Sequence, residues 1–262
     1  MGFFDRLRAG SQRWAKTIVV VPPPAHLQNV GLMPLKQERT LACDEEAVRQ
    51  DTIKIRLAHD ASRTEAARIL VERRYEQKGY FSLGDPSRNL ACPENVTLAS
   101  YKGDEMMGTL SLGFDTGYGL LVDELYKPEI DSLRREGRRV CEFTKLAIDS
   151  KRTSKRMLAG LFHIAFLYAE RIWGYTDIVI EVNPSHISFY QRMLGFEVLG
   201  KERMCPRVNA PAVLLRADTH WGRKMVEQFG GRPELSKQER SLFPYFLSKA
   251  EEDKILERLM QG

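Results

Sequence analysis

Hydrophobic and polar residues follow two different periods along the middle of the chain, which predicts strands and helices in turn. Residues 52–58 alternate one by one, as a half-buried strand does, and residues 62–77 carry apolar side chains at helical spacing. The same patterns predict strands at 96–101, 106–112, 140–148, 177–182, 196–199 and 212–215, and helices at 125–136, 155–173 and 185–194. This order predicts an α/β fold in which a mixed β-sheet is flanked by helices.

The same pattern divides the chain into three regions. Residues 1–50 form an N-terminal extension, partly amphipathic, to which we assign no fold of its own. Residues 51–218 carry the predicted sheet. Residues 219–262 predict a helical extension, with helices at 221–229 and 236–259 and an interruption near Pro244.

Composition and charge exclude several classes of protein. Hydrophobic residues make up 43% and charged residues 29% of the 262, which is typical of a globular chain and excludes wholesale disorder. The 40 basic and 35 acidic residues leave a net charge of +5, which is too small to predict nucleic acid as a partner. No apolar run approaches the ~18 residues that a membrane-spanning helix needs.

Cysteines and histidines indicate neither a metal site nor a disulfide framework. The four cysteines have no CxxC spacing, and the five histidines are scattered, so we expect reduced thiols and no metal. We therefore expect a cytoplasmic protein. Its basic, aromatic N-terminal segment is expected to make weak contact at most with the surface of the inner membrane.

Residues 140–196 resemble the GNAT acyltransferase superfamily. They combine a strand, a basic turn, a long helix, a strand ending at Asn183, a Phe-Tyr pair and a closing Gly195-Phe196. The basic turn, residues 151–156, lacks the glycines with which users of acetyl-CoA hold the pyrophosphate at the helix N-terminus. Acyl-homoserine-lactone synthases and long-chain N-acyl amino acid synthases, two groups similar to GNAT enzymes, share this departure.

Shorter motifs favour the second of these groups. Residues 142–146 (EFTKL) resemble its Glu-x-Ser/Thr-Arg-Phe/Leu motif, with lysine in place of arginine, and residues 73–75 resemble its Arg/aromatic segment. Residues 203–215 and 241–246 are similar to the N-acyl amino acid synthases and their relatives linked to bacterial exosortase systems. The resemblance implies an enzyme that moves a long-chain fatty acyl group from acyl carrier protein to the α-amine of an amino acid. It implies no tightly bound cofactor, with acyl-phosphopantetheine of the carrier, or acyl-CoA, as donor substrate.

Two residues are candidates for proton transfer. Glu142 lies in an otherwise apolar strand, where burial would raise the pKa of its carboxyl and make it a general base for the amine. The alternative is an ordinary strand glutamate paired with Lys145 or Arg139. The resemblance implies that Tyr190 protonates the departing thiolate; the alternative is a core aromatic residue.

Four residues are candidates for binding the substrates: Arg74, Thr144, Lys145 and Asn183. Lys145 follows Glu142 by three residues, so the two point to opposite sides of a regular strand, and a β-bulge would bring them together. Lys145 or Arg74 could bind the carboxylate of the acceptor, and Thr144 belongs to the same motif. Asn183 could bond the pantetheine or simply begin a helix.

A basic run at residues 134–156 could bind an acidic carrier protein. Nine cationic residues stand there against three acidic ones, a net charge of +6. Near the predicted helix N-terminus, a phosphopantetheine phosphate could use Lys155 or Arg156, with Lys151 and Arg152 adjacent. The alternative is a solvated charged loop. Nucleic acid is not expected, because no aromatic residues alternate with the charges to stack on bases.

Three other functions remain open from the sequence. The first is an acyl-CoA-dependent GNAT N-acetyltransferase with an altered phosphate loop. The second is an autoinducer synthase of the homoserine-lactone type, which would require S-adenosylmethionine, and the C-terminal motifs speak against it. The third is a GNAT fold without catalysis that binds protein or membrane. No cysteine stands beside a base, so direct transfer without a covalent enzyme intermediate is expected.

Overall fold

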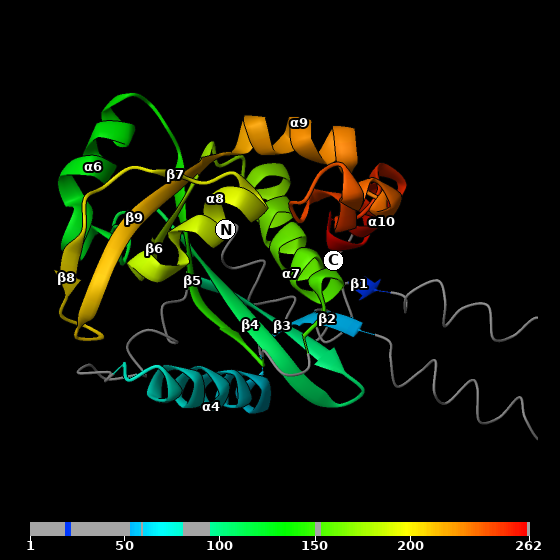
Figure 1. Ribbon diagram of the computed structural model, residues 1–262, viewed down its shortest axis with the longest axis horizontal. Coiled ribbons are helices and arrows are strands. Elements are labelled where there is room, and N and C mark those ends of the chain that lie inside the picture. Colours follow the sequence, from blue (N-terminus) through cyan, green and yellow to red (C-terminus); the bar gives the residue numbers. More distant parts are fainter. Residues whose placement is uncertain (1–18, 22–52, 59, 81–94, 150–152, 261–262) are drawn as a thin grey trace, which may run out of the picture.

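The computed structural model describes residues 19–21, 53–58, 60–80, 95–149 and 153–260 (Figure 1). Within them the strands form one 9-stranded sheet in the order β1-β2-β3-β4-β5-β6-β9-β7, and β8 pairs with β9 outside this path. Helices pack on both faces, as the alternation of periods predicts. The fold is GNAT-like.

One half of the sheet is antiparallel throughout. Each strand there is the sequence neighbour of the next, and the left-handed Gly103 (φ 60°) turns the chain between β3 and β4. These strands are β1 (Val19–Val21), β2 (Ile53–Leu57), β3 (Asn95–Lys102), β4 (Glu105–Phe114) and β5 (Val140–Ile148).

The other half begins at a parallel pair. β5 pairs in parallel with β6 (Asp177–Val182), and β6 pairs in antiparallel with β9 (Ala210–Asp218). The short strands β7 (Glu197–Val198) and β8 (Arg203–Cys205) both pair with β9. A parallel connection needs a crossover, which the helix between β5 and β6 supplies.

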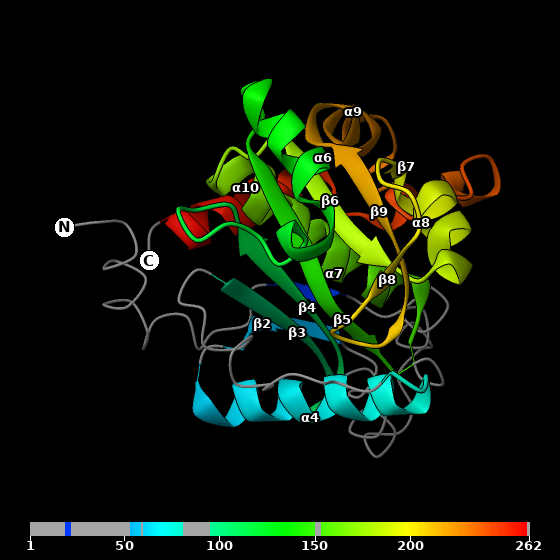
Figure 2. The ribbon, with the colours of Figure 1, turned by 90° about the vertical axis from the view of Figure 1, so that its left-hand side faces the viewer.

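Two hydrophobic clusters lie on opposite faces of the sheet. The larger one packs against α7 (Lys155–Leu167), whose side chains are buried at ten of thirteen positions, as expected for a core helix. The smaller one packs against α6 (Asp123–Arg135). The helix α4 (Ala61–Gln77) contacts β4 and β5 and lies across the sheet from α7 (Figures 1 and 2).

Local sequence signals explain where the helices around the parallel strands begin and end. The Ser154 hydroxyl caps α7 by accepting a hydrogen bond from the Met157 N–H at 3.2 Å. After the π-helix Tyr168–Ile172 the chain enters β6. Helix α8 (Ile187–Leu194) ends at Gly195, which has the left-handed conformation (φ 71°) that favours glycine.

One expectation about the C-terminal end of the chain needs correction. At the other end, Val19–Val21 pairs with β2 as an edge strand of the sheet, and the assignment of 1–50 as an extension without a fold of its own stays a prediction. The helix expected at 236–259 starts only at α10 (Lys249–Met260); before it the chain forms the 3₁₀ turns Pro233–Lys237 and Phe243–Tyr245. Burial of Phe243 and Phe246 in the large cluster, together with Pro244, overrides the helical spacing there.

The C-terminal segment packs on the same core through a buried polar contact. The Leu247 N–H donates to His163 Nδ1 at 2.8 Å, so Nε2 carries the proton of a neutral imidazole and donates to Glu252 at 2.7 Å. Burial lowers the pKa of His163 against the opposing effect of Glu252. Arg223, on α9 (Thr219–Phe229), also pairs with Glu252, at 2.8 Å. The division of the chain into a sheet-bearing region that ends at residue 218 and a C-terminal helical extension stays a prediction.

Candidate active site

The strands β5 and β6 separate to form a V in the sheet. They are in register only at Val140–Asp177, Cys141–Ile178 and Glu142–Val179, and both strands continue beyond these pairs. Backbone N–H and C=O groups on the facing edges above Glu142 then need other partners. The vertex of the V is therefore the place where a ligand can bind to backbone in the middle of the sheet.

A β-bulge follows Glu142 on β5, the irregularity that would be needed to bring Lys145 to the side of Glu142. Ser111 is opposite Thr144, whereas Thr109 is opposite Ala147, so the bulged strand has an extra residue there. Lys145 lies in this bulge with a left-handed backbone (φ 52°), and its carbonyl accepts a hydrogen bond from the Thr109 hydroxyl at 3.0 Å. The bulge changes the direction of the side chains from Lys145 onwards, whereas Glu142 and Thr144, which precede it, stay on one face of the strand.

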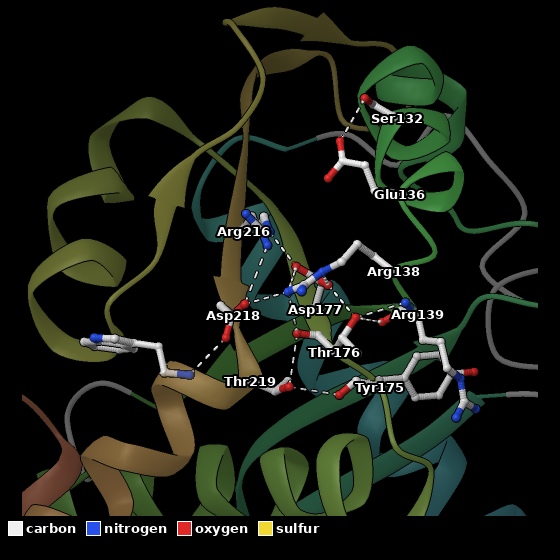
Figure 3. A network of polar contacts seen from close by, with 11 residues as sticks. Ser132, Glu136, Arg138, Arg139, Tyr175, Thr176, Asp177, Arg216, Asp218 and Thr219 are labelled. Atoms are coloured by element: carbon white, nitrogen blue, oxygen red, sulfur yellow. Dashed lines mark hydrogen bonds and ion pairs between the residues drawn. The ribbon is translucent and has the colours of Figure 1, made fainter.

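A charge network around one buried carboxylate, with half-buried partners, fixes the closed end of the V (Figure 3). The Asp177 side chain is 0% exposed and accepts hydrogen bonds from Arg138 Nε and Arg216 Nε, both at 2.5 Å. Arg138 also reaches Asp218 Oδ2 at 2.5 Å. Since these residues come from the start of β6, the end of β9 and the turn before β5, the network ties three segments together below the vertex.

Glu142 is buried at the vertex with a perturbed carboxyl. Its side chain is 5% exposed, and its two oxygens accept the N–H groups of Leu121 and Val122 at 2.8 and 3.0 Å. Burial raises the pKa of Glu142 to about 7, against the opposing effect of these hydrogen bonds. Gly113 on β4 makes room for it, because a Cβ there would lie 2.8 Å from Glu142 Cγ. The carboxyl is poised for proton transfer near neutral pH.

Sequence reasoning missed two charged residues next to Glu142. Glu181 on β6 forms an ion pair with Arg207, which also donates to Glu124 Oε2 at 2.5 Å and to the Leu121 carbonyl at 3.2 Å. The signal for Glu181 was available, because it is a charged residue flanked by the apolar Ile180 and Val182 near the end of β6, just as Glu142 is flanked by Cys141 and Phe143 in β5. Arg207 lies in the segment 203–215 that carries the family resemblance.

Aromatic residues flank the V. Tyr190 is buried among Phe162, Phe189 and Phe196, and burial raises the pKa of its hydroxyl. Tyr75, at the end of α4, also has a buried phenol, with a pKa of about 12, and interacts electrostatically with Tyr190. Tyr190 thus packs as a core aromatic residue, and its role towards a thiolate stays a prediction.

Two other candidates bind within the protein itself. Arg74 Nη2 forms an ion pair with Asp149 Oδ1 at 2.6 Å, just after β5, which ties the end of α4 to the end of this strand. Asn183 Oδ1 accepts the Ser185 N–H at 3.1 Å and so caps the 3₁₀ turn Pro184–His186. Asn183 therefore begins a helix, the structural alternative given by the sequence; neither contact tests a role in binding substrate.

The basic run does not form one continuous patch. Arg134 is paired with Asp115, Asp123 and Asp131, and Arg138 belongs to the buried network around Asp177. Lys155 is exposed and Arg156 half-buried at the start of α7. Lys151 and Arg152 lie outside the described residues. The net charge of +6 in the sequence therefore overstates the charge available to a partner, since carboxylates outside the run neutralise part of it.

Other kinds of site are not found in the part of the chain that the structure describes. It contains no group of three or more His, Cys, Asp or Glu side chains that could hold a metal ion. Among its helices, none combines the length and apolar character needed to cross a membrane. An apolar cavity of about 40 Å³ lies on the α7 side, lined by Phe143, Phe162, Phe166, Leu194, Trp221 and Phe243 among others. That volume holds a few water-sized groups at most.

Comparison with known proteins identifies the family. The model of the FeeM N-acyl amino acid synthase family matches residues 66–218. The structure of FeeM, an N-acyl amino acid synthase from uncultured soil microbes, superposes with a TM-score of 0.61 and 28% identity, covering 66% of this chain and 94% of that chain.

Other solved structures are more distant. An N-acetyltransferase from Staphylococcus aureus Mu50 gives a TM-score of 0.46 and 14% identity over 64% of this chain and 98% of its own. Escherichia coli ElaA gives 0.47 and 14% over 63% and 99%. Among curated proteins none matches the chain. The family match spans more than half of the sequence and includes the vertex of the V, so the chain belongs to the FeeM family of N-acyl amino acid synthases and is an acyltransferase.

Proposed function

We propose that the chain transfers a long-chain fatty acyl group from acyl carrier protein to the α-amine of an amino acid, with Glu142 as general base. The observation that carries the proposal is the position of Glu142, buried at the vertex of the V with a pKa of about 7. Such a carboxyl takes a proton from an ammonium at neutral pH and can release it again.

The reaction is a direct displacement. The ammonium of the acceptor gives one proton to Glu142, directly or through a water molecule, and the freed lone pair attacks the thioester carbonyl carbon. Backbone N–H groups on the separated strands stabilise the developing oxyanion. The new C–N bond forms, the C–S bond breaks, and the nitrogen releases its second proton to leave a neutral amide. The thiolate takes up one proton, for which Tyr190 is the candidate donor, and the proton released by the nitrogen restores the Tyr190 hydroxyl through solvent, while Glu142 returns its proton to solvent.

An enzyme-bound thioester is disfavoured by the nearest cysteine. Cys141 precedes Glu142 but points to the opposite face, into the large hydrophobic cluster. Burial raises the pKa of its thiol well above the usual value, so little thiolate forms. The other described cysteine, Cys205, is buried as well, and burial also raises the pKa of its thiol, so neither of them supplies a ready thiolate. This supports direct transfer to the amine.

Charge near the N-terminus of α7 supports a carrier protein as donor. Lys155 and Arg156 lie in the first turn of this helix, where the helix dipole also favours an anion. Lys151 and Arg152 would add to them. Lys145, Thr144 and Arg74 remain the proposed contacts for the acceptor carboxylate, with the ion pair between Arg74 and Asp149 as a competitor.

A comparison of donors tests this proposal. The purified protein is given acyl carrier protein or CoA carrying the same long acyl chain, with a mixture of amino acids, and products are quantified by mass spectrometry. We expect N-acyl amino acids to form at least about tenfold faster from the carrier, with a rate that falls as salt screens the charges.

The charge-reversal pair Lys155→Glu and Arg156→Glu gives the control. It should slow transfer from the carrier protein much more than transfer from CoA, because both donors offer a pantetheine-linked phosphate but only the carrier also offers an acidic protein surface. Equal or faster transfer from CoA in the unaltered protein would favour the CoA-dependent alternative. A lactone product formed with S-adenosylmethionine would favour the autoinducer synthase.

A further inference from the structure

Glu181 lies beside Glu142 on the same face of the sheet, just past the point where β5 and β6 separate. Val179 is the last residue of β6 in register with β5, and it is paired with Glu142. Side chains alternate along a strand, so Glu181, two residues further on, points to the face that Val179 and Glu142 share. The negative charge of Glu181 also raises the pKa of Glu142, because a nearby carboxylate disfavours a second ionised carboxyl.

One carboxylate oxygen of Glu181 is paired and the other is not. The side chain is 13% exposed, and Oε2 accepts a charge-assisted hydrogen bond from Arg207 Nη2. Oε1 is buried and has no hydrogen-bond partner among the described residues. Burial raises the pKa of Glu181, and Arg207 is the strongest opposing influence. The Cys205 thiol also lowers this pKa, but it is a weak donor and makes no hydrogen bond that satisfies Oε1. A buried oxygen in this state costs free energy that a ligand N–H would recover.

Arg207 holds Glu181 in place. Its Nη1 donates to the Leu121 carbonyl and to Glu124, and its Nη2 donates to Glu181, so both terminal nitrogens are engaged. The same loop before α6 supplies the N–H groups that bind Glu142. The two carboxylates are therefore positioned by one short segment of chain, on either side of the opening between the strands.

We propose that Glu181 Oε1 accepts a hydrogen bond from the α-ammonium of the acceptor amino acid and holds its nitrogen beside Glu142. This inference rests on the proposed function and deepens it. A primary ammonium has several N–H donors, so it can give one proton to Glu142 while another N–H stays bonded to Glu181. Arg207 is shared between two carboxylates, Glu181 and Glu124, so with Glu142 also ionised this group of four residues carries net negative charge, which complements a cationic ligand. Glu181 itself transfers no proton.

Steady-state kinetics of Glu181→Gln test this inference. The substitution keeps the size of the side chain and removes its charge. We expect the KM for the amino acid to rise at least about tenfold, which corresponds to the loss of a hydrogen bond to a charged group, while the KM for the acyl donor stays within about twofold. With hydroxylamine, which is uncharged at neutral pH, the variant should lose much less.

Glu129→Gln is the matched control. It also removes a carboxylate from an arginine, Arg203, and the Glu129 side chain is 19% exposed, but neither residue contacts Arg207 or Glu181 in any hydrogen bond or ion pair of the described residues. Its KM for the amino acid should equal that of the unaltered protein. If Glu181→Gln does not fold, as judged by thermal unfolding, Glu181→Asp keeps the charge but withdraws it by one methylene, and it should raise the same KM.

The outcomes separate this inference from the proposed function. If the unaltered protein makes no N-acyl amino acid from any donor, the proposed function itself is wrong. Activity in the unaltered protein, with the acceptor KM of Glu181→Gln unchanged, overturns only the role of Glu181. A KM that rises equally for the donor and the acceptor also overturns it, because this pattern indicates general disruption of the vertex.

Discussion

Replacing Glu142 with glutamine lowers kcat/KM for acyl transfer by about 10²- to 10⁴-fold, the range that a positioned general base contributes. The carboxyl at the vertex has a pKa of about 7, so kcat/KM of the unaltered protein should rise with pH and level off above that value. In the variant no such ionisation remains. Initial rates of N-acyl amino acid formation between about pH 5.5 and 8.5 measure both effects.

The substitution also disturbs structure, and the pH dependence of stability separates the two effects. Glutamine can accept the Leu121 or the Val122 N–H with its one oxygen but not both, which costs about 1–3 kcal/mol. Because folding raises the pKa of Glu142 from 4.5 to about 7, the folded state holds a proton that the unfolded state has lost between these values. The free energy of unfolding therefore falls by up to about 3 kcal/mol as pH rises across this window.

Chemical denaturation at several pH values measures this slope. The slope due to Glu142 should be absent from Glu142→Gln, which mimics the protonated carboxyl. A variant that is folded at pH 7 and retains the full rate and pH profile of the unaltered protein would remove Glu142 from the mechanism. A slope that survives in the variant would assign the pH dependence to other groups.

Replacing Asp177 with asparagine should destabilise the protein by about 3–5 kcal/mol, the usual cost of removing one partner from a buried ion pair. Asp177 is 0% exposed and binds both Arg138 and Arg216, so the variant leaves two arginines competing for the remaining carboxylate, Asp218 (Figure 3). Since these residues hold together the closed end of the V, loss of the network should also weaken the pairing of β5 with β6 at the vertex. Urea unfolding curves measure the change.

Asp131→Asn is the matched control for this network. Asp131 also binds two cationic side chains, Lys127 and Arg134, but its side chain is 34% exposed on the surface of α6. Solvent screens surface pairs of this kind, so the control should unfold nearly like the unaltered protein. If the two substitutions lowered the free energy of unfolding equally, burial of Asp177 would not be what makes its ion pairs stabilising.

The sequence predicted the central sheet well because its strands have unambiguous patterns. The predicted limits of β5 and β6 agree with the structure, and a β-bulge lies at Lys145. Burial of Glu142 could be inferred from the apolar residues on either side of it, Val140, Cys141 and Phe143. Strand β8 was missed, because three residues with mixed polarity give no periodic signal and are held by their pairing with β9.

Charge pairing over long sequence separations was the part that could not be predicted. The partners of Arg134 and Arg138 include Asp115, Asp177 and Asp218, which lie outside the basic run and are brought to it only by the fold. The contact of Arg207 with Glu181 has the same origin, because β9 brings the segment after β8 next to β6. The net charge of a sequence segment therefore does not give the electrostatic potential at the surface of the folded protein, which is what a binding partner experiences.

Mass spectrometry of lipid extracts tests the central claim most directly. Bacteria expressing the unaltered chain are compared with bacteria expressing Glu142→Gln at matched levels of folded protein. The account predicts new N-acyl amino acids in the first extract and their loss in the second, and the masses identify the acyl chain and the acceptor. Folded protein without any new N-acyl amino acid in either extract would contradict the assignment of a long-chain acyl group and an amino acid acceptor.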